Sequence, residues 1–137
     1  MQFALGATIL SGWNYPRPIF SAVPSAEERA PLLRFTKAAG FDGIDLADSW
    51  LDWHAMSDDD LRALRAQVEG EGLVCAGLNP YRSILARHES ADRNEARFHR
   101  TVEVAAVLGV PCVNIPLSVP FPAVWSESER APGQLAL

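Results

Sequence analysis

The stretch AAGFDGIDL, residues 38–46, decides how this sequence folds. Gly40 is suited to end a helix, because glycine adopts the left-handed cap conformation at little cost. The residues from Phe41 to Leu46 then form an apolar run that is typical of a buried strand. A helix that ends in glycine and leads at once into an apolar strand is part of a β/α unit. It predicts a parallel sheet covered by helices.

The same link between helix and strand occurs twice more along the chain. Residues 71–77 read EGLVCAG, and residues 105–114 read AAVLGVPCVN. A first apolar run, residues 2–10, precedes a loop with glycine and two prolines from Ser11 to Pro18. The order of elements is therefore β-α-β-α-β-α-β, which amounts to about four β/α units with parallel strands.

Caps and periodicity locate the three helices. Ser25 and Ser57 have the pattern of N-caps with acidic residues in the following turn, and a third helix begins near Asp92. Pro31 predicts either a kink or a main helix that begins at Pro31 itself. We expect apolar faces made of Leu32, Leu33 and Phe35 in the first helix, Leu61, Leu64 and Val68 in the second, and Phe98, Val102, Ala105 and Leu108 in the third.

Composition and charge exclude some classes of function. The chain has 137 residues, 48% of them hydrophobic and 21% charged, which is ordinary for a globular domain. A net charge of -5 brings no cationic field to a nucleic-acid backbone or an anionic membrane. There is no apolar stretch of ~20 residues and no basic N-terminal region of a signal peptide, so we expect a cytoplasmic protein. Cys75 and Cys112 lie in apolar runs and are expected to be buried free thiols.

The links AAGFDGIDL and AAVLGVPCVNI resemble those of the xylose isomerase-like TIM-barrel superfamily. This superfamily includes sugar phosphate isomerases and epimerases, inosose dehydratases and endonuclease IV-type enzymes. The resemblance extends over residues 1–117 and implies an α/β fold, a partial (β/α)8 TIM barrel. A full barrel needs about 250 residues. The chain would therefore supply an N-terminal half-barrel, residues 1–119, and an irregular C-terminal tail, residues 120–137.

The resemblance also implies isomerase or epimerase chemistry on a small sugar-like substrate. In that reaction a carboxylate takes a proton from a carbon next to a carbonyl, and a divalent metal (Mn, Mg or Zn) stabilises the enediolate oxygens. The family takes this metal with Glu, Asp, His and Glu from later strands, and no residue of this chain matches those ligands. Endonuclease-like activity on the same fold is less favoured, because the chain is acidic and has no basic stripe.

A non-enzymatic alternative stays open. A truncated half-barrel has open sheet edges at its first and fourth strands, and unpaired edges are prone to associate. Such a chain would act only by pairing with a copy of itself, as a homodimer, or with a separate second half. The segment from Ala123 to Leu137, which lacks the periodicity of a fourth helix, favours this alternative.

The candidate site residues lie at or near the carboxyl ends of the predicted strands, where TIM barrels build their active sites. Asp45 leads the set, at a position where the family usually has Glu. Its alternative is a structural carboxylate bonded to backbone or to an arginine. His54 is either a proton shuttle or substrate ligand, or a packing residue. The predicted substrate-binding residues are Asp45, His54, Trp13, Asn79, Arg82 and Asn114.

Other conspicuous side chains have two interpretations each. Trp13, Trp50 and Trp53 either wall a sugar pocket or pack a loop onto the barrel rim. Arg82 matches the geometry of a phosphate, although a surface arginine is the commoner outcome. The acidic run at residues 58–60 is explained by a helix N-terminus rather than by a metal site. No residue is assigned as catalytic from the sequence.

Overall fold

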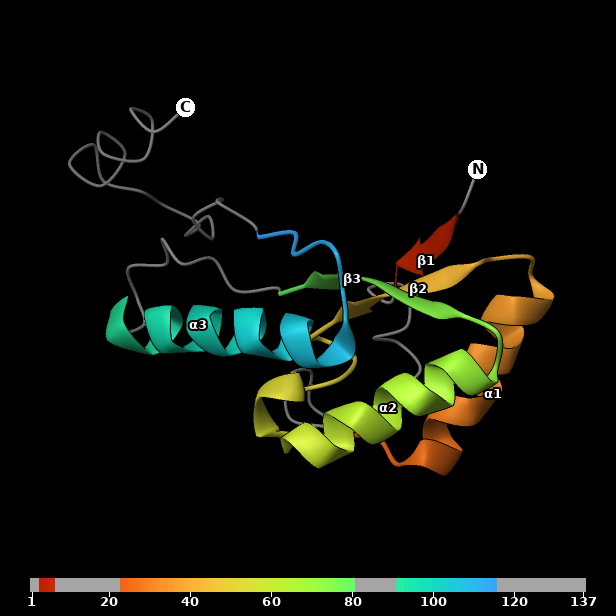
Figure 1. Cartoon of the computed structure of the whole chain (residues 1–137), viewed down its shortest axis with the longest axis horizontal. Helices are drawn as coiled ribbons and strands as arrows, with labels where there is room; N and C mark the ends of the chain where they lie inside the picture. The colour runs from red at the N-terminus through yellow and green to blue at the C-terminus, as the bar shows by residue number, and fades with distance from the viewer. Residues whose placement is uncertain (1–2, 7–22, 81–90, 116–137) are drawn as a thin grey trace, which may run out of the picture.

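A computed structural model of the chain describes residues 3–6, 23–80 and 91–115, and the side chains of α3 from Glu95 onward. Strands and helices alternate (Figure 1). The elements are β1 (Ala4–Gly6), α1 (Ala26–Ala38), β2 (Gly43–Ala47), the short 3-10 helix η2 (Trp53–Ala55), α2 (Asp58–Gly70), β3 (Val74–Asn79) and α3 (Ala91–Leu108). The strands form one parallel sheet in the order β1-β2-β3. The predicted alternation and the parallel sheet are confirmed.

The place of the predicted fourth strand is marked by a single parallel bridge between Leu78 and Val113. The backbone N–H of Leu78 donates to the carbonyl of Cys112 at 3.0 Å, and that of Asn114 donates to the carbonyl of Leu78 at 2.8 Å. After α3 the chain therefore returns to the sheet beside β3, as a fourth parallel strand does. Residues 116 and 117 of the predicted strand lie outside the described residues.

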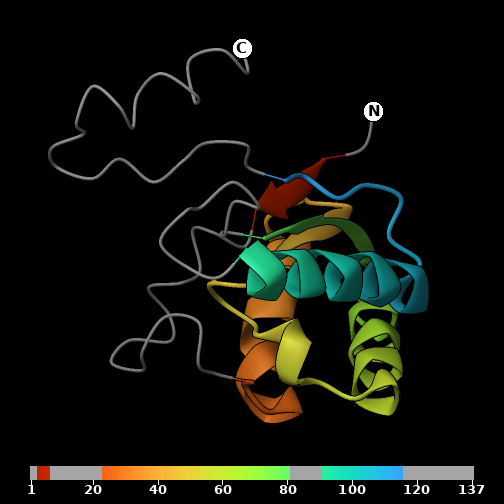
Figure 2. The same cartoon turned by 90° about the vertical axis from the view of Figure 1, so that its left-hand side faces the viewer.

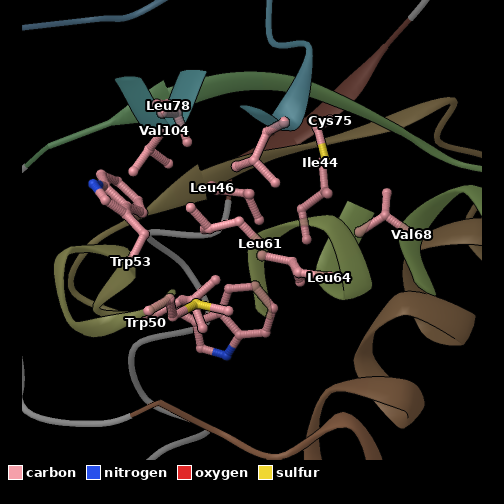
Figure 3. Packing of buried hydrophobic residues seen from close by; sticks show 14 of the residues in the cluster. Ile44, Leu46, Trp50, Trp53, Leu61, Leu64, Val68, Cys75, Leu78 and Val104 are labelled. Atoms are coloured by element: carbon pink, nitrogen blue, oxygen red, sulfur yellow. The ribbon is translucent and has the colours of Figure 1, made fainter. Parts of the chain in front are cut away.

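Helices α1, α2 and α3 all lie on one side of the sheet (Figures 1 and 2). Ile44 and Leu46 of β2 are fully buried in the layer between sheet and helices (Figure 3). The matching stripe on α2 is the predicted one, Leu61, Leu64 and Val68, each 0% exposed. Because a strand alternates its side chains between two faces, Asp45 points to the opposite face. In a barrel the helix layer is outermost, so that opposite face is the interior.

Both predicted N-caps are present, and each is part of a capping box. The hydroxyl of Ser25 accepts from the backbone N–H of Glu28 at 3.2 Å, and the Glu28 carboxylate accepts from the backbone N–H of Ser25 at 2.7 Å. Ser57 and Asp60 form the same reciprocal pair at the start of α2. Helix α1 continues through Pro31 without interruption. The alternative in which the main helix begins at Pro31 is therefore wrong.

Two predicted apolar faces differ from those observed. Phe35 of α1 is 52% exposed, whereas Thr36 is fully buried. Val102 of α3 is 49% exposed, whereas Thr101 is buried at 1%. In each helix the threonine hydroxyl donates to the carbonyl four residues earlier, so a buried threonine leaves no unsatisfied donor. The predictions for Phe35 and Val102 are wrong because a self-satisfied threonine takes the inner place instead.

The two cysteines have different surroundings. Cys75 is 8% exposed, and burial raises the pKa of its thiol to about 11. Cys112 is exposed, so the expectation that it is buried is wrong. It lies on the outermost segment that pairs with the described sheet, and no described element covers it there. Among the described helices, none is both long and apolar enough to span a bilayer.

Candidate functional site

Asp45 lies in the middle of β2, on the face of the sheet away from the helices. It is in register with Gly6 of β1 and with Gly77 of β3. Neither neighbour has a side chain, so the Asp45 carboxyl lies between two bare stretches of backbone. A methyl group at position 77 would be 2.7 Å from Oδ1 of Asp45 and 3.3 Å from its Cγ. The carboxyl therefore leans over Gly77 and fills the space of the missing side chain.

The carboxyl of Asp45 is partly buried without a charged or hydrogen-bonding partner for its Oδ1 atom among the described residues, and this Oδ1 atom is itself buried. Burial raises the pKa of the Asp45 carboxyl above its ordinary value of 3.8. The alternative of a structural carboxylate, bonded to backbone or to an arginine, is not seen among the described residues. A buried polar atom of this kind costs folding free energy, and a carboxyl with such a raised pKa marks a candidate functional site.

Asn79 and Asn114 share the inner face with Asp45 and lie closer to the strand ends. Asn79 is opposite Ala47, which is two residues beyond Asp45 on β2, and residues two apart on a strand face the same way. The bridge at Val113 sets Asn114 beside Asn79. Asn79 is half-buried and Asn114 is exposed. The structure thus brings three of the predicted site residues onto one face.

His54 lies elsewhere, where η2 meets α3. Its Nε2 atom is 3.1 Å from Oγ1 of Thr101, and its Nδ1 atom is 3.3 Å from both Oδ1 of Asp52 and Nη2 of Arg97. The Thr101 hydroxyl donates to the carbonyl of Arg97 at 2.9 Å, so Oγ1 accepts from Nε2–H. Nδ1 then accepts from Arg97. This is a neutral histidine, and burial, with the nearby charge of Arg97, lowers the pKa of His54 below 6.5.

Both ring nitrogens of His54 therefore have protein partners. Thr101, His54 and Asp52 are spaced like a nucleophile, base and orienting carboxylate. However, Thr101 is 1% exposed and its hydroxyl proton is bound to a backbone carbonyl, so it is not a nucleophile. The cluster instead joins the connection after β2 to α3. No contact among the described residues links His54 to Asp45, and its predicted role in substrate binding stays a prediction.

Two of the tryptophans predicted to line a sugar pocket, Trp50 and Trp53, are part of the core. Trp50 is 3% exposed and Trp53 is fully buried (Figure 3). Both rings belong to the buried core, which agrees with the packing interpretation of Trp50 and Trp53. Trp13 and Arg82 lie outside the described residues. The acidic residues 58–60 form the first turn of α2, as predicted.

The described residues do not form a metal site. Among them, no three His, Cys, Asp or Glu side chains lie close enough together to hold an ion. Asp45 is a single carboxyl, and one ligand does not fix the geometry of a divalent cation.

Sequence analysis missed the glycine that makes room for Asp45. Gly77 was placed in an apolar strand without a role, although an isolated glycine inside a strand often marks a close approach of other groups. It also missed Asp52, Arg97 and Thr101 as partners of His54. Asp52 is two positions from His54 and caps η2, so a local signal existed for it. None existed for Arg97 and Thr101, which are 43 and 47 positions from His54 and meet it only in the folded chain.

A parallel sheet with its described helices on one face and polar side chains on the other is the architecture of part of a β/α barrel. Residues 33–135 match the family model described as xylose isomerase-like TIM barrel. The chain belongs to that family. The resemblance inferred from the helix-to-strand links is thereby confirmed.

Solved structures with the same fold are about twice as long as this chain. A xylose isomerase-like TIM barrel protein from Mycobacterium smegmatis, in complex with magnesium, has a TM-score of 0.68 at 24% identity; the match covers 96% of this chain and 47% of that one. A D-psicose 3-epimerase solved in the presence of D-fructose has a TM-score of 0.63 at 22% identity, covering 99% and 44%. A probable 3-DHS dehydratase from Bacillus anthracis has a TM-score of 0.58 at 12% identity, covering 99% and 45%. A search of curated proteins finds no match.

Proposed function

We propose that this chain supplies substrate-binding residues to a sugar or sugar-phosphate isomerase or epimerase. The observation that carries the proposal is the Oδ1 atom of Asp45, which is buried on the inner face and has no partner in the described part of the chain. TIM barrels bind their substrates at the carboxyl ends of the strands, on the inner side of the sheet. Family membership and the epimerase among the solved structures of this fold support the choice of chemistry.

The three polar residues on the inner face suit a polyhydroxylated ligand. A sugar hydroxyl both donates and accepts hydrogen bonds. The Asp45 carboxyl accepts when it is ionised and donates when it is protonated, and its raised pKa extends the range in which it donates. The side-chain amides of Asn79 and Asn114, on the same inner face of the sheet, offer further donors and acceptors. Such a set fixes orientation without requiring a charge on the substrate.

In isomerisation and epimerisation a base removes a proton from the carbon next to a carbonyl. The substrate must be held so that this carbon faces the base, and positioning of this kind supplies a large part of the rate. We assign Asp45, with Asn79 and Asn114, to this positioning. A divalent metal would stabilise the enediolate oxygens in the intact family fold, but the described residues offer no site that would hold it. None of the described residues is assigned the role of base.

Sugar binding tests the proposal directly. D-Fructose and D-fructose 6-phosphate would be titrated into the purified chain and followed by calorimetry. We expect Asp45→Asn to weaken binding by about tenfold, because it replaces a charge-assisted hydrogen bond to the carboxylate with a weaker one to a neutral amide. The matched control is Asp59→Asn, which makes the same chemical change at a carboxylate that is 94% exposed on α2. Equal affinities for the parent chain and Asp45→Asn would contradict the proposal, as would the absence of binding by the parent.

The alternative in which a half-barrel acts by pairing remains a prediction. Val74, at the start of β3, is 51% exposed, and a methyl group on Gly43 would lie 2.9 Å from its Cγ2, so this apolar side chain is on the inner face. Pairing with a second copy would cover it. Light scattering measures the mass: a value of twice 15.0 kDa supports the pairing of two copies, and 15.0 kDa contradicts it.

A further inference from the structure

The carboxyl of Asp45 packs against Gly77 of the neighbouring strand β3. We propose that Gly77 is a positioning residue for Asp45: because position 77 has no side chain, the carboxyl lies against β3 instead of projecting into the barrel interior. This inference rests on the proposed function, in which Asp45 binds the substrate. In that case Gly77 of β3 fixes the position of the Asp45 carboxyl, and therefore how deep in the barrel a sugar hydroxyl would contact it.

The contacts of Gly77 single out Asp45. Oδ1 of Asp45 is 2.7 Å from the position of a Cβ on Gly77, and Cγ of Asp45 is 3.3 Å from it. The remaining neighbour, the carbonyl oxygen of Cys112, is at 3.6 Å, an ordinary contact distance. A methyl group at position 77 would therefore be compatible with the backbone around it and incompatible with the present place of the carboxyl.

An irregularity in the sheet brings Gly77 to this place. Ile44 is opposite Cys75, but the next residue, Asp45, is opposite Gly77, so the register shifts by one residue and Ala76 is left over on β3. Without this shift Ala76 would be opposite Asp45. A bulge of this kind changes which side chains of a strand face a given neighbour. Here it places the residue without a side chain next to the carboxyl.

Gly43 provides a contrast on β2 itself. A Cβ on Gly43 would lie 2.8 Å from the backbone oxygen of Val74, so the obstacle there is the main chain. At Gly77 the obstacle is the end of a side chain, which can rotate away. Gly77→Ala is therefore expected to keep the fold and to displace Asp45, whereas Gly43→Ala is expected to destabilise the chain and to leave Asp45 in place.

The experiment follows the Asp45 carboxyl by carbon NMR while the pH is varied. In the parent chain the pKa of Asp45 is raised by burial. In Gly77→Ala we expect this pKa to fall toward the ordinary value, because the displaced carboxyl reaches solvent. Gly70→Ala, at the end of α2 with no described atom within 4 Å of the added methyl, is the control and should leave the Asp45 pKa unchanged. An unchanged Asp45 pKa in a folded Gly77→Ala chain would overturn the inference.

A double variant decides the case in which Gly77→Ala does not fold. In Asp45→Ala/Gly77→Ala the carboxyl is gone, so the methyl group has room. A folded double variant then supports the inference, and an unfolded one shows that Gly77 serves the backbone and overturns it. A calorimetric titration with D-fructose adds the link to function: Gly77→Ala should lose the same tenfold in affinity as Asp45→Asn. If the parent does not bind D-fructose, the proposed function fails, while the NMR titration still decides the role of Gly77.

Discussion

The Nε2 atom of His54 lies 3.1 Å from Oγ1 of Thr101, and this contact joins the connection after β2 to helix α3. The threonine hydroxyl serves two groups at once, because it also donates to the carbonyl of Arg97. Thr101→Val keeps the shape of the side chain and leaves Nε2–H without an acceptor. We expect it to lower the free energy of unfolding by about 1–3 kcal/mol, measured by urea denaturation. Thr101→Ser keeps the hydroxyl and should cost less; equal losses for the two variants would assign the effect to packing.

The pH dependence of stability should report on His54. Burial lowers the pKa of His54 in the folded chain below its ordinary 6.5, so between these two values the unfolded chain binds more protons. Stability therefore rises with pH through this window and is lost as the pH falls below 6.5. His54→Gln, which has no titrating group, should remove that part of the slope. Urea denaturation of both chains at pH 7.5 and pH 5 measures it, and identical slopes would contradict the prediction.

Asp45→Asn should stabilise the chain. The pKa of Asp45 is raised in the folded state, so the folded chain holds the proton more strongly and stability falls as the pH rises through the window above 3.8. At neutral pH the cost of the buried carboxylate persists, and an amide of the same size avoids it. We expect a gain of up to about 1 kcal/mol in the free energy of unfolding, together with the tenfold weaker sugar binding proposed above. A loss of stability would indicate a structural partner for the carboxylate.

The cap of α2 is open to a simple test. The hydroxyl of Ser57 accepts from the backbone N–H of Asp60 at 3.2 Å, and the Asp60 carboxylate accepts from the backbone N–H of Ser57 at the same distance. Ser57→Ala should lower the free energy of unfolding by about 1 kcal/mol, because the backbone N–H of Asp60 loses its acceptor. Ser57→Asn, which also caps helices well, should retain most of the stability. Thermal denaturation compares the three chains.

The sequence by itself determined the local structure and the family. Glycines at the helix ends, serines at the helix starts and apolar strands are signals carried by neighbouring residues, and the three helices and the parallel strands are found where these signals place them. Gly40, for example, has a φ of 88°, the left-handed conformation expected of a glycine that ends a helix. The sequence also identifies Asp45 as a candidate site residue, because the apolar pattern of the second strand places it near the carboxyl end of that strand.

Only the tertiary structure decided what surrounds each candidate. The shift of register between β2 and β3 sets Gly77 rather than Ala76 beside Asp45, and this depends on how two strands pair, not on either strand alone. The tryptophans at positions 50 and 53 are buried in the core that the folded chain forms. Two partners of His54, Arg97 and Thr101, come from α3. Thr101 displaces Val102 from the buried face because its hydroxyl is satisfied within the helix. Burial and unpaired polar atoms depend on contacts between distant segments, so periodicity along the chain does not predict them.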